Sequence, residues 1–137
     1  MNSGPENSRQ RTGAIGEAAV RAHVQSLGWE IVDHNVRWRE GELDLIAVDG
    51  ATLVVAEVKT LVGRAADGSP AFSPFESIGA RKQDQIRSLT RRWISDDVRR
   101  IRGSVNTRFT GLRFDAFAVI LDRDGAVTSI EHLEDAF

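Results

Sequence analysis

The sequence contains no cysteine, which excludes disulfide bonds and thiolate metal sites, so any bound metal must be held by oxygen or imidazole ligands. Long hydrophobic runs are also absent, since no apolar segment approaches the roughly 18 residues of a membrane-spanning helix. The N-terminus lacks the charged and then apolar pattern of a secretion signal. We therefore expect a cytoplasmic protein that does not associate with a membrane.

A strong net charge is lacking too. The formal charge at pH 7 is −2, which argues against a protein that binds nucleic acid through a globally basic surface. The charges are unevenly distributed, however, because residues 81–113 hold ten Lys and Arg against three Asp, whereas residues 114–137 hold six acidic residues and one Arg. A basic middle and an acidic end can give the folded protein one face suited to phosphates.

The length of 137 residues and the hydrophobic content of 41% are ordinary for one globular domain. Residues 1–12 are polar and show no hydrophobic periodicity, so we expect a disordered arm followed by a single domain over 13–137. The predicted elements are a helix over 13–27 ended by Gly28, two short strands bent near Asn35, a hairpin over 41–60, a helix from a capping box at 73–76 to about 93–95, a linking segment over 96–110, a central strand over 112–121 and an edge strand over 126–130. This order predicts a mixed α/β domain with a central sheet and flanking helices.

Residues 41–60 contain the strongest local signal in the chain. Asp49-Gly50 lies between two β-branched, apolar runs, which is typical of a β-hairpin. With these two residues as the loop, Glu42 faces Glu57 across the hairpin. Asp44 and Glu57 are then diagonal neighbours roughly 7–8 Å apart at Cβ, a separation that a shared cation can bridge.

The same face of the predicted hairpin carries Glu42, Asp44, Glu57 and Lys59 at its open end. Carboxylates repel one another, and a half-buried charge must be paired or must bind a metal. One interpretation is a solvated strand end with a weak surface pair between Glu57 and Lys59. The other is a site for a hard cation such as Mg²⁺ or Mn²⁺, held by Asp44 and Glu57. The apolar run that surrounds Glu57 favours the second.

Several basic residues are candidates for contact with phosphates. Arg37 lies just before the carboxylates, where it either neutralises them or contacts a phosphate. Lys82 falls on the core-facing stripe of the predicted second helix, so we expect its side chain to point into a cleft. Arg87 and Arg91, together with Arg92, lie off that stripe and form a basic helix face.

An ordered set of motifs resembles a known family. Asp44, followed after the hairpin by Glu57-Val58-Lys59, resembles the core of the PD-(D/E)xK nucleases. Over about residues 13–137 the chain more closely resembles the bacterial YraN-like family, through Gly16-Glu17, Asn35, Gly41-Glu42-x-Asp44, Glu57-Val58-Lys59, Lys82, Arg113-Phe114-Asp115 and Ala136-Phe137. The chain departs from the family pattern at Leu61, where an arginine is common.

The resemblance implies a restriction-endonuclease-like fold and a metal-dependent endonuclease that acts on DNA, including branched or junction structures. It implies that Asp44 and Glu57 bind Mg²⁺ or Mn²⁺ and that Lys59 takes part in catalysis. Glu42 would be a further site residue. Glu17 has two interpretations: a first-turn residue that complements the helix dipole, or a fourth carboxylate of the site.

The same resemblance places Arg113 among the residues that contact nucleic acid. Similarity to archaeal Holliday-junction resolvases, which act as two-fold dimers, implies a homodimer. The alternative function is a non-catalytic nucleic-acid-binding or interaction module of the same fold, because fold alone does not fix function.

Overall fold

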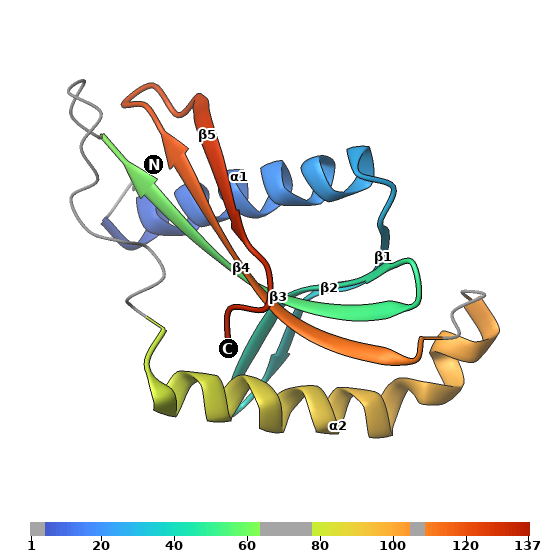
Figure 1. The fold of residues 1–137 in the computed structure, drawn as a ribbon. Helices are drawn as coiled ribbons and strands as arrows, with labels where there is room; N and C mark the ends of the chain where they lie inside the picture. The colour runs from blue at the N-terminus through green and yellow to red at the C-terminus, as the bar shows by residue number, and fades with distance from the viewer. Residues whose placement is uncertain (1–4, 64–77, 105–108) are drawn as a thin grey trace.

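The computed structural model describes residues 5–63, 78–104 and 109–137 (Figure 1). The elements follow in the order α1 (Pro5–Ser26), β1 (Glu30–Trp38), β2 (Gly41–Asp49), β3 (Thr52–Val62), α2 (Ala80–Ser104), β4 (Gly111–Leu121) and β5 (Val127–Leu133). The five strands form one sheet in the order β1-β2-β3-β4-β5, in which β3 and β4 are parallel and the other pairs are antiparallel. The predicted mixed α/β class is confirmed, and the architecture is consistent with a restriction-endonuclease-like fold.

The two helices cover opposite faces of the sheet (Figure 1). On one face, Val20 and Val24 of α1 pack against buried side chains that include Val54 and Phe117. On the other face, Leu89 and the other apolar residues of α2 pack against the alternate residues of β2 and β3. Because both faces are covered, the central strands are continuous apolar runs rather than alternating ones.

The predictions for the C-terminal third are largely confirmed. β4 lies between two neighbours, and β5 forms an edge of the sheet. Phe137 packs onto the core on the α2 side, where its ring stacks on Phe114 with a centroid distance of 5.3 Å. No helix in the described ranges is long and apolar enough to cross a membrane.

The first helix begins earlier than predicted. It starts at Pro5 rather than Gly13, so residues 5–12 of the expected disordered arm are helical, whereas residues 1–4 lie outside the described part. A polar segment can extend a helix that tertiary packing has already nucleated, because each added residue gains a backbone hydrogen bond. The predicted end is confirmed, since Gly28 has a φ of 86° and the Trp29 N–H donates to the Val24 carbonyl at 3.0 Å.

The second helix extends further than predicted. It runs to Ser104, whereas a linking segment was expected from Asp96. Arginine is a good helix former, and no glycine or proline interrupts the segment before Gly103, so the charged composition did not stop the helix. The capping box expected at 73–76 lies outside the described residues.

The hairpin between β2 and β3 forms, but the predicted register is wrong. The loop is Gly50-Ala51, and Asp49 pairs with Thr52. Gly50 has a φ of 61°, and a glycine with positive φ at the first loop position is typical of a type II′ turn. Asp49 remains in the strand, where its carboxylate accepts hydrogen bonds from Arg113 at 3.3 Å. Arg113 is distant from the turn in the sequence, so the preferences of the turn residues alone could not predict this contact.

The corrected register brings the acidic residues closer together than predicted. Val48 pairs with Leu53 rather than Ala51, which is a shift of two residues. Because side chains alternate with a period of two, such a shift by itself leaves the faces of the two strands near the turn unchanged. Continued past Leu45 and Ala56, the last pair, this register would place Asp44 level with Glu57 instead of diagonal to it.

Candidate functional site

Asp44 lies at a point where β2 turns about its own axis. Leu43 packs in the core on the α2 side, whereas Leu45 packs on the α1 side, although residues two apart share a face in a regular strand. The Asp44 carboxylate reaches the backbone of β3, where Oδ2 accepts a hydrogen bond from the Val58 N–H at 2.9 Å. Asp44 is only 6% exposed, so its charge is largely removed from water.

Glu57 follows the last residue of β3 that pairs with β2. The pairing ends at Ala56, and β3 continues beside β4 alone. The Glu57 side chain is 19% exposed. In a strand the N–H and C=O of one residue point the same way, so the Val58 carbonyl faces the same gap as the N–H that binds Asp44.

The two carboxyl groups have perturbed pKa values. Burial, and then the negative charge of Glu57, raise the pKa of Asp44 to about 8, and Glu17 and Glu42 add to the rise. Burial also raises the pKa of Glu57, although the Lys82 ammonium partly offsets the effect. Without a cation, the pair therefore retains a proton at neutral pH. This arrangement disfavours the doubly ionised state unless a positive charge enters.

Lys82 contacts this pair, and Lys59 follows Glu57 on the same strand. Lys82 of α2, which was expected to point into a cleft, places its Nζ 3.4 Å from Glu57 Oε1 and so lies beside the acidic pair. Lys59 is half-buried on β3, two residues after Glu57 and therefore on the same side of the strand. The site thus combines carboxylates with cationic groups supplied by a strand and a helix.

Glu17 belongs to α1, so it approaches the pair from the face of the sheet opposite α2. Helix α1 lies close to β3 at Gly16, where an added Cβ would come within 3.0 Å of the Thr60 Cβ. Burial and the charge of Glu42 raise the pKa of Glu17, whereas a hydrogen bond with Asn35 lowers it. Because α1 begins at Pro5, Glu17 is not in the first turn, and the helix-dipole interpretation is wrong.

The donor set of Asp44, Glu57 and the Val58 carbonyl fits a divalent cation in part. Among the described residues, no group of three or more His, Asp or Glu side chains is arranged to hold a metal ion. Asp44 and Glu57 nonetheless supply two hard oxygen ligands, and the Val58 carbonyl faces the same gap. Mg²⁺ is usually held by one or two carboxylates together with water and substrate phosphate, so this donor set fits Mg²⁺ or Mn²⁺ in the presence of a substrate.

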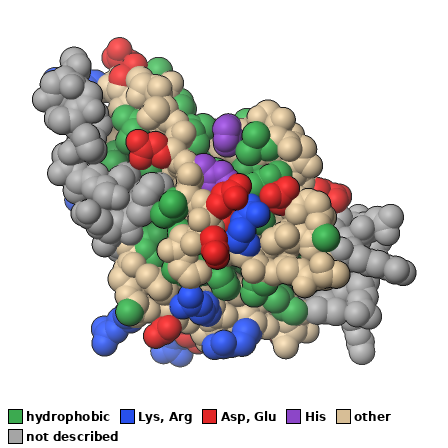
Figure 2. Space-filling model, in the orientation of Figure 1, with side chains coloured by type: hydrophobic (Ala, Val, Ile, Leu, Met, Phe, Trp, Pro, Cys, Tyr) green, Lys and Arg blue, Asp and Glu red, His purple; other side chains and the backbone are tan. Residues whose placement is uncertain are grey.

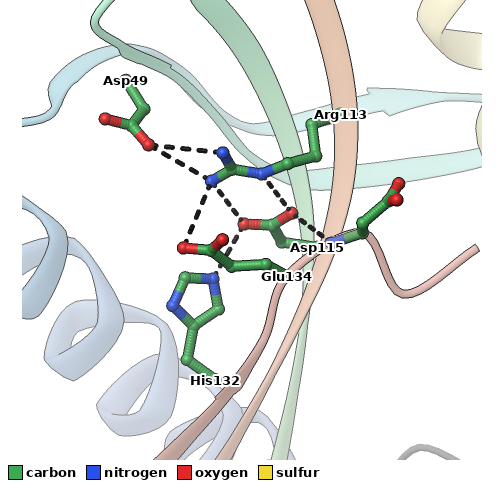
Figure 3. A network of polar contacts seen from close by, with 6 residues as sticks. Asp49, Arg113, Asp115, His132 and Glu134 are labelled. Carbon is green, nitrogen blue, oxygen red and sulfur yellow. Dashed lines mark hydrogen bonds and ion pairs between the residues drawn. The ribbon is translucent and has the colours of Figure 1, made fainter.

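Arg113 does not lie at this site. Figure 3 shows it between the carboxylates of Asp49, Asp115 and Glu134, with His132 on the far side of Asp115. Its Nε donates to Asp115 Oδ1 at 2.8 Å, and its guanidinium lies 5.5 Å from the Trp29 ring. The structure therefore assigns Arg113 to an internal network rather than to the expected contact with nucleic acid.

Asp115 is the centre of that network and is fully buried. Burial alone would raise its pKa, but hydrogen bonds from Arg113, His132 and the Asp135 N–H hold the pKa below the usual range. The Arg-Phe-Asp motif thus has a structural explanation, because it joins β4, the end of β2 and the C-terminal segment. Sequence reasoning missed His132, since nothing local to it indicates its partner.

The predicted basic face of α2 is only partly available to a ligand. Figure 2 shows Lys and Arg side chains along the lower edge of the molecule, over α2. The guanidinium of Arg87 lies 5.6 Å from the centroids of both the Phe114 and Phe137 rings. Arg92 pairs with Glu40 at 3.1 Å, whereas Arg91 is exposed. Arg37, 76% exposed, pairs with Glu42 at 3.2 Å beside the acidic pair.

The fold and this site define a mixed α/β protein with an acidic pair and lysines at the point where two central strands separate. The chain belongs to the uncharacterised protein family UPF0102, whose model matches residues 16–119. It is 36% identical to a UPF0102 protein of Acidothermus cellulolyticus over 137 residues, which cover 98% of this chain and 99% of the relative. It is 40% identical to one from Rhodococcus jostii over 125 residues, 91% of this chain and 94% of that relative. A third, from Frankia casuarinae, is 36% identical over 130 residues, 95% and 98% of the two chains.

Proposed function

We propose that this protein is a metal-dependent endonuclease of the PD-(D/E)xK type that hydrolyses phosphodiester bonds in DNA. The observation that carries the proposal is the enforced proximity of Asp44 and Glu57. Their burial raises both pKa values, so ionising both carboxyl groups is unfavourable unless a bound cation offsets their charge. Such a site stabilises the fold fully only when a positive charge is added.

In this proposal Asp44 and Glu57 hold Mg²⁺ or Mn²⁺. When bound, the cation supplies polarisation of the phosphate and a lowered pKa of water. Lys59 offsets the negative charge that develops on the phosphoryl oxygens, because it follows Glu57 by two residues and so lies on the same side of β3. Glu42 and Glu17 increase the negative potential of the site and so favour uptake of the cation.

The alternative is a nucleic-acid-binding module of this fold without turnover. It is favoured by the lack of a third close acidic ligand among the described residues. Metal titration separates the two functions. A nuclease site should bind Mn²⁺ with a defined stoichiometry in calorimetry, and the melting temperature of the protein should rise with the Mn²⁺ concentration. A module without turnover should show neither effect.

The deciding experiment incubates the protein with linear, single-stranded, flap and four-way-junction DNA, with and without Mn²⁺. We expect cleavage of at least one substrate only with Mn²⁺, and no cleavage by Asp44→Asn or Glu57→Gln. Asp84→Asn is the matched control, because Asp84 is 83% exposed on α2. Absence of Mn²⁺ binding even with DNA present would refute the mechanism, and DNA binding without Mn²⁺ binding or cleavage would favour the module.

A further inference from the structure

A lysine from α2 lies on the solvent side of the acidic pair formed by Asp44 and Glu57. Lys82 Nζ lies 3.4 Å from Glu57 Oε1. The side chains of Lys82 and Glu57 are 43% and 19% exposed, and Asp44 is 6% exposed. Exposure therefore falls from the ammonium to the innermost carboxylate, so a negatively charged ligand that approaches this pair from solvent meets Lys82 first.

The contact between Lys82 and Glu57 has the features of an exchangeable ion pair. Its length of 3.4 Å exceeds the roughly 2.7–2.9 Å of a strong hydrogen bond between charged groups. Arg113, by contrast, binds the fully buried Asp115 at 2.8 Å. A lysine ammonium stands on a flexible stem and can donate in three directions, so it changes partners more readily than a planar guanidinium. Lys82 can therefore leave Glu57 when another cation takes its place.

The position of Lys82 in its own helix is locally unfavourable. Helix α2 begins at Ala80, and its first turn contains no acidic residue. The N-terminus of a helix carries a partial positive charge, which disfavours a cation in the first turn. The negative charge of Glu57 offsets this disadvantage. The position of Lys82 is thus explained by the acidic pair and not by the preferences of α2.

One ammonium does not balance the charge of the acidic pair. The pair can carry two negative charges, and Glu42 and Glu17 add to the negative potential around it. A divalent cation supplies twice the charge of a lysine and takes carboxylate oxygens as ligands. Because Lys82 and such a cation repel each other and share Glu57 as a partner, they compete for the site.

We propose that Lys82 is a resident counter-ion of Glu57 that a divalent cation displaces, and that the released ammonium then contacts a phosphate of the bound DNA. Lys82 thus weakens metal binding before DNA arrives and strengthens DNA binding once the metal is in place. A phosphate is the expected second partner, because Lys82 lies on the solvent side of a site where substrate phosphate completes the metal ligands. The inference rests on the proposed function, since it concerns how the same site takes up metal and DNA.

The first measurement is Mn²⁺ binding in calorimetry without DNA, at an ionic strength of about 0.15 M so that distant charges are screened. Lys82→Met keeps the apolar stem but removes the ammonium. It should bind Mn²⁺ about 5- to 10-fold more tightly than the wild type, because the repulsion of a divalent ion is removed. Lys82→Arg, which keeps the charge, should not bind Mn²⁺ more tightly.

Arg81→Met is the matched control for this measurement. Arg81 is an exposed cation at the neighbouring position of α2, so the substitution removes the same charge from the same helix. Its Mn²⁺ affinity should stay within about twofold of the wild type at this ionic strength. Unchanged or weaker Mn²⁺ binding by Lys82→Met would overturn the proposal.

The resident contact with Glu57 is tested by thermal melting in EDTA. Lys82→Met should lower the melting temperature of the wild type. The same substitution should lower the melting temperature of Glu57→Gln by less, because a neutral side chain needs no counter-ion. Equal effects in the two backgrounds would show that Lys82 does not serve Glu57, and would overturn the proposal.

The contact with phosphate is tested by the salt dependence of DNA binding. The measurement uses a short linear duplex and a Lys59→Ala background, which by the proposed mechanism binds DNA but cleaves it slowly. With Mn²⁺, Lys82→Met should lower the log–log slope by about 0.9, because one phosphate contact is lost. In EDTA the slope should not change, because Lys82 remains at Glu57. A slope that is unchanged with Mn²⁺, or lowered equally in EDTA, would overturn the exchange.

Failure of this proposal is distinguishable from failure of the nuclease. Mn²⁺ binding and cleavage by the wild type, with no effect of Lys82→Met on the Mn²⁺ affinity, would reject the exchange alone. Tighter Mn²⁺ binding by Lys82→Met and a slope that changes only with metal, but no cleavage of any DNA, would support the exchange and reject catalysis. Absence of Mn²⁺ binding by both proteins would reject the metal site and the exchange with it.

Discussion

Replacement of Asp44 by Asn should make the metal-free protein more stable at alkaline pH. Burial and the charge of Glu57 raise the pKa of Asp44 to about 8, compared with about 3.9 in an unfolded chain. Between these values the folded protein binds one proton more than the unfolded chain. Stability is therefore fully present below about pH 4 and is lost progressively as the pH rises to about 8. At 1.36 kcal/mol per unit, the loss is on the order of 5 kcal/mol.

The Asn side chain is neutral throughout this range, and its oxygen can still accept the hydrogen bond that Val58 donates to Asp44. Urea unfolding in EDTA at pH 5, 6.5 and 8 measures the effect. The stability of Asp44→Asn relative to the wild type should increase by on the order of 4 kcal/mol from pH 5 to pH 8. The exposed control Asp84→Asn should follow the wild type at every pH. Parallel profiles for Asp44→Asn and the wild type would show that the carboxylate is not held in an unfavourable environment.

Lys59→Ala should bind Mn²⁺ and DNA almost as well as the wild type but cleave on the order of 10²–10³ times more slowly, because the variant loses an interaction that is made only in the transition state. Single-turnover cleavage at the wild-type rate would reject this role. Gly16→Ala should lower the melting temperature, since its Cβ would collide with the Thr60 side chain, and restoration by Thr60→Ala tests the cause. Arg113→Ala should destabilise the fold by roughly 3–5 kcal/mol in urea unfolding, because the fully buried Asp115 would lose its cationic partner, although His132 and the Asp135 N–H would still bond it. A loss below 1 kcal/mol would show that the network is weak.

The sequence predicted the acidic site because that site depends on local pattern. Asp-Gly between apolar runs indicates a hairpin, and the hairpin brings Asp44 and Glu57 to the same open end whichever of the two registers forms. Gly28 ended α1 as predicted, because a glycine with positive φ is a local requirement of the cap. These features are set by residues that are neighbours in the chain.

Other features were decided only by contacts between distant segments. Asp49 remains in β2, where Arg113 binds it, and the hairpin loop is Gly50-Ala51. The same guanidinium reaches Asp115, so a residue that resembled a phosphate ligand became part of a buried ionic network. No local pattern distinguishes an arginine that meets solvent from one that meets a buried carboxylate.

The surroundings of the acidic pair were likewise fixed by tertiary packing. Lys82 reaches Glu57 because α2 packs across the sheet, and Glu17 reaches the site because Gly16 permits close approach of α1 to β3. The pKa of about 8 at Asp44 arises from burial, which exists only once both helices have covered the sheet. Residue type and spacing determined which side chains were available for chemistry, whereas the exclusion of water, which sets their charge state, required the folded core.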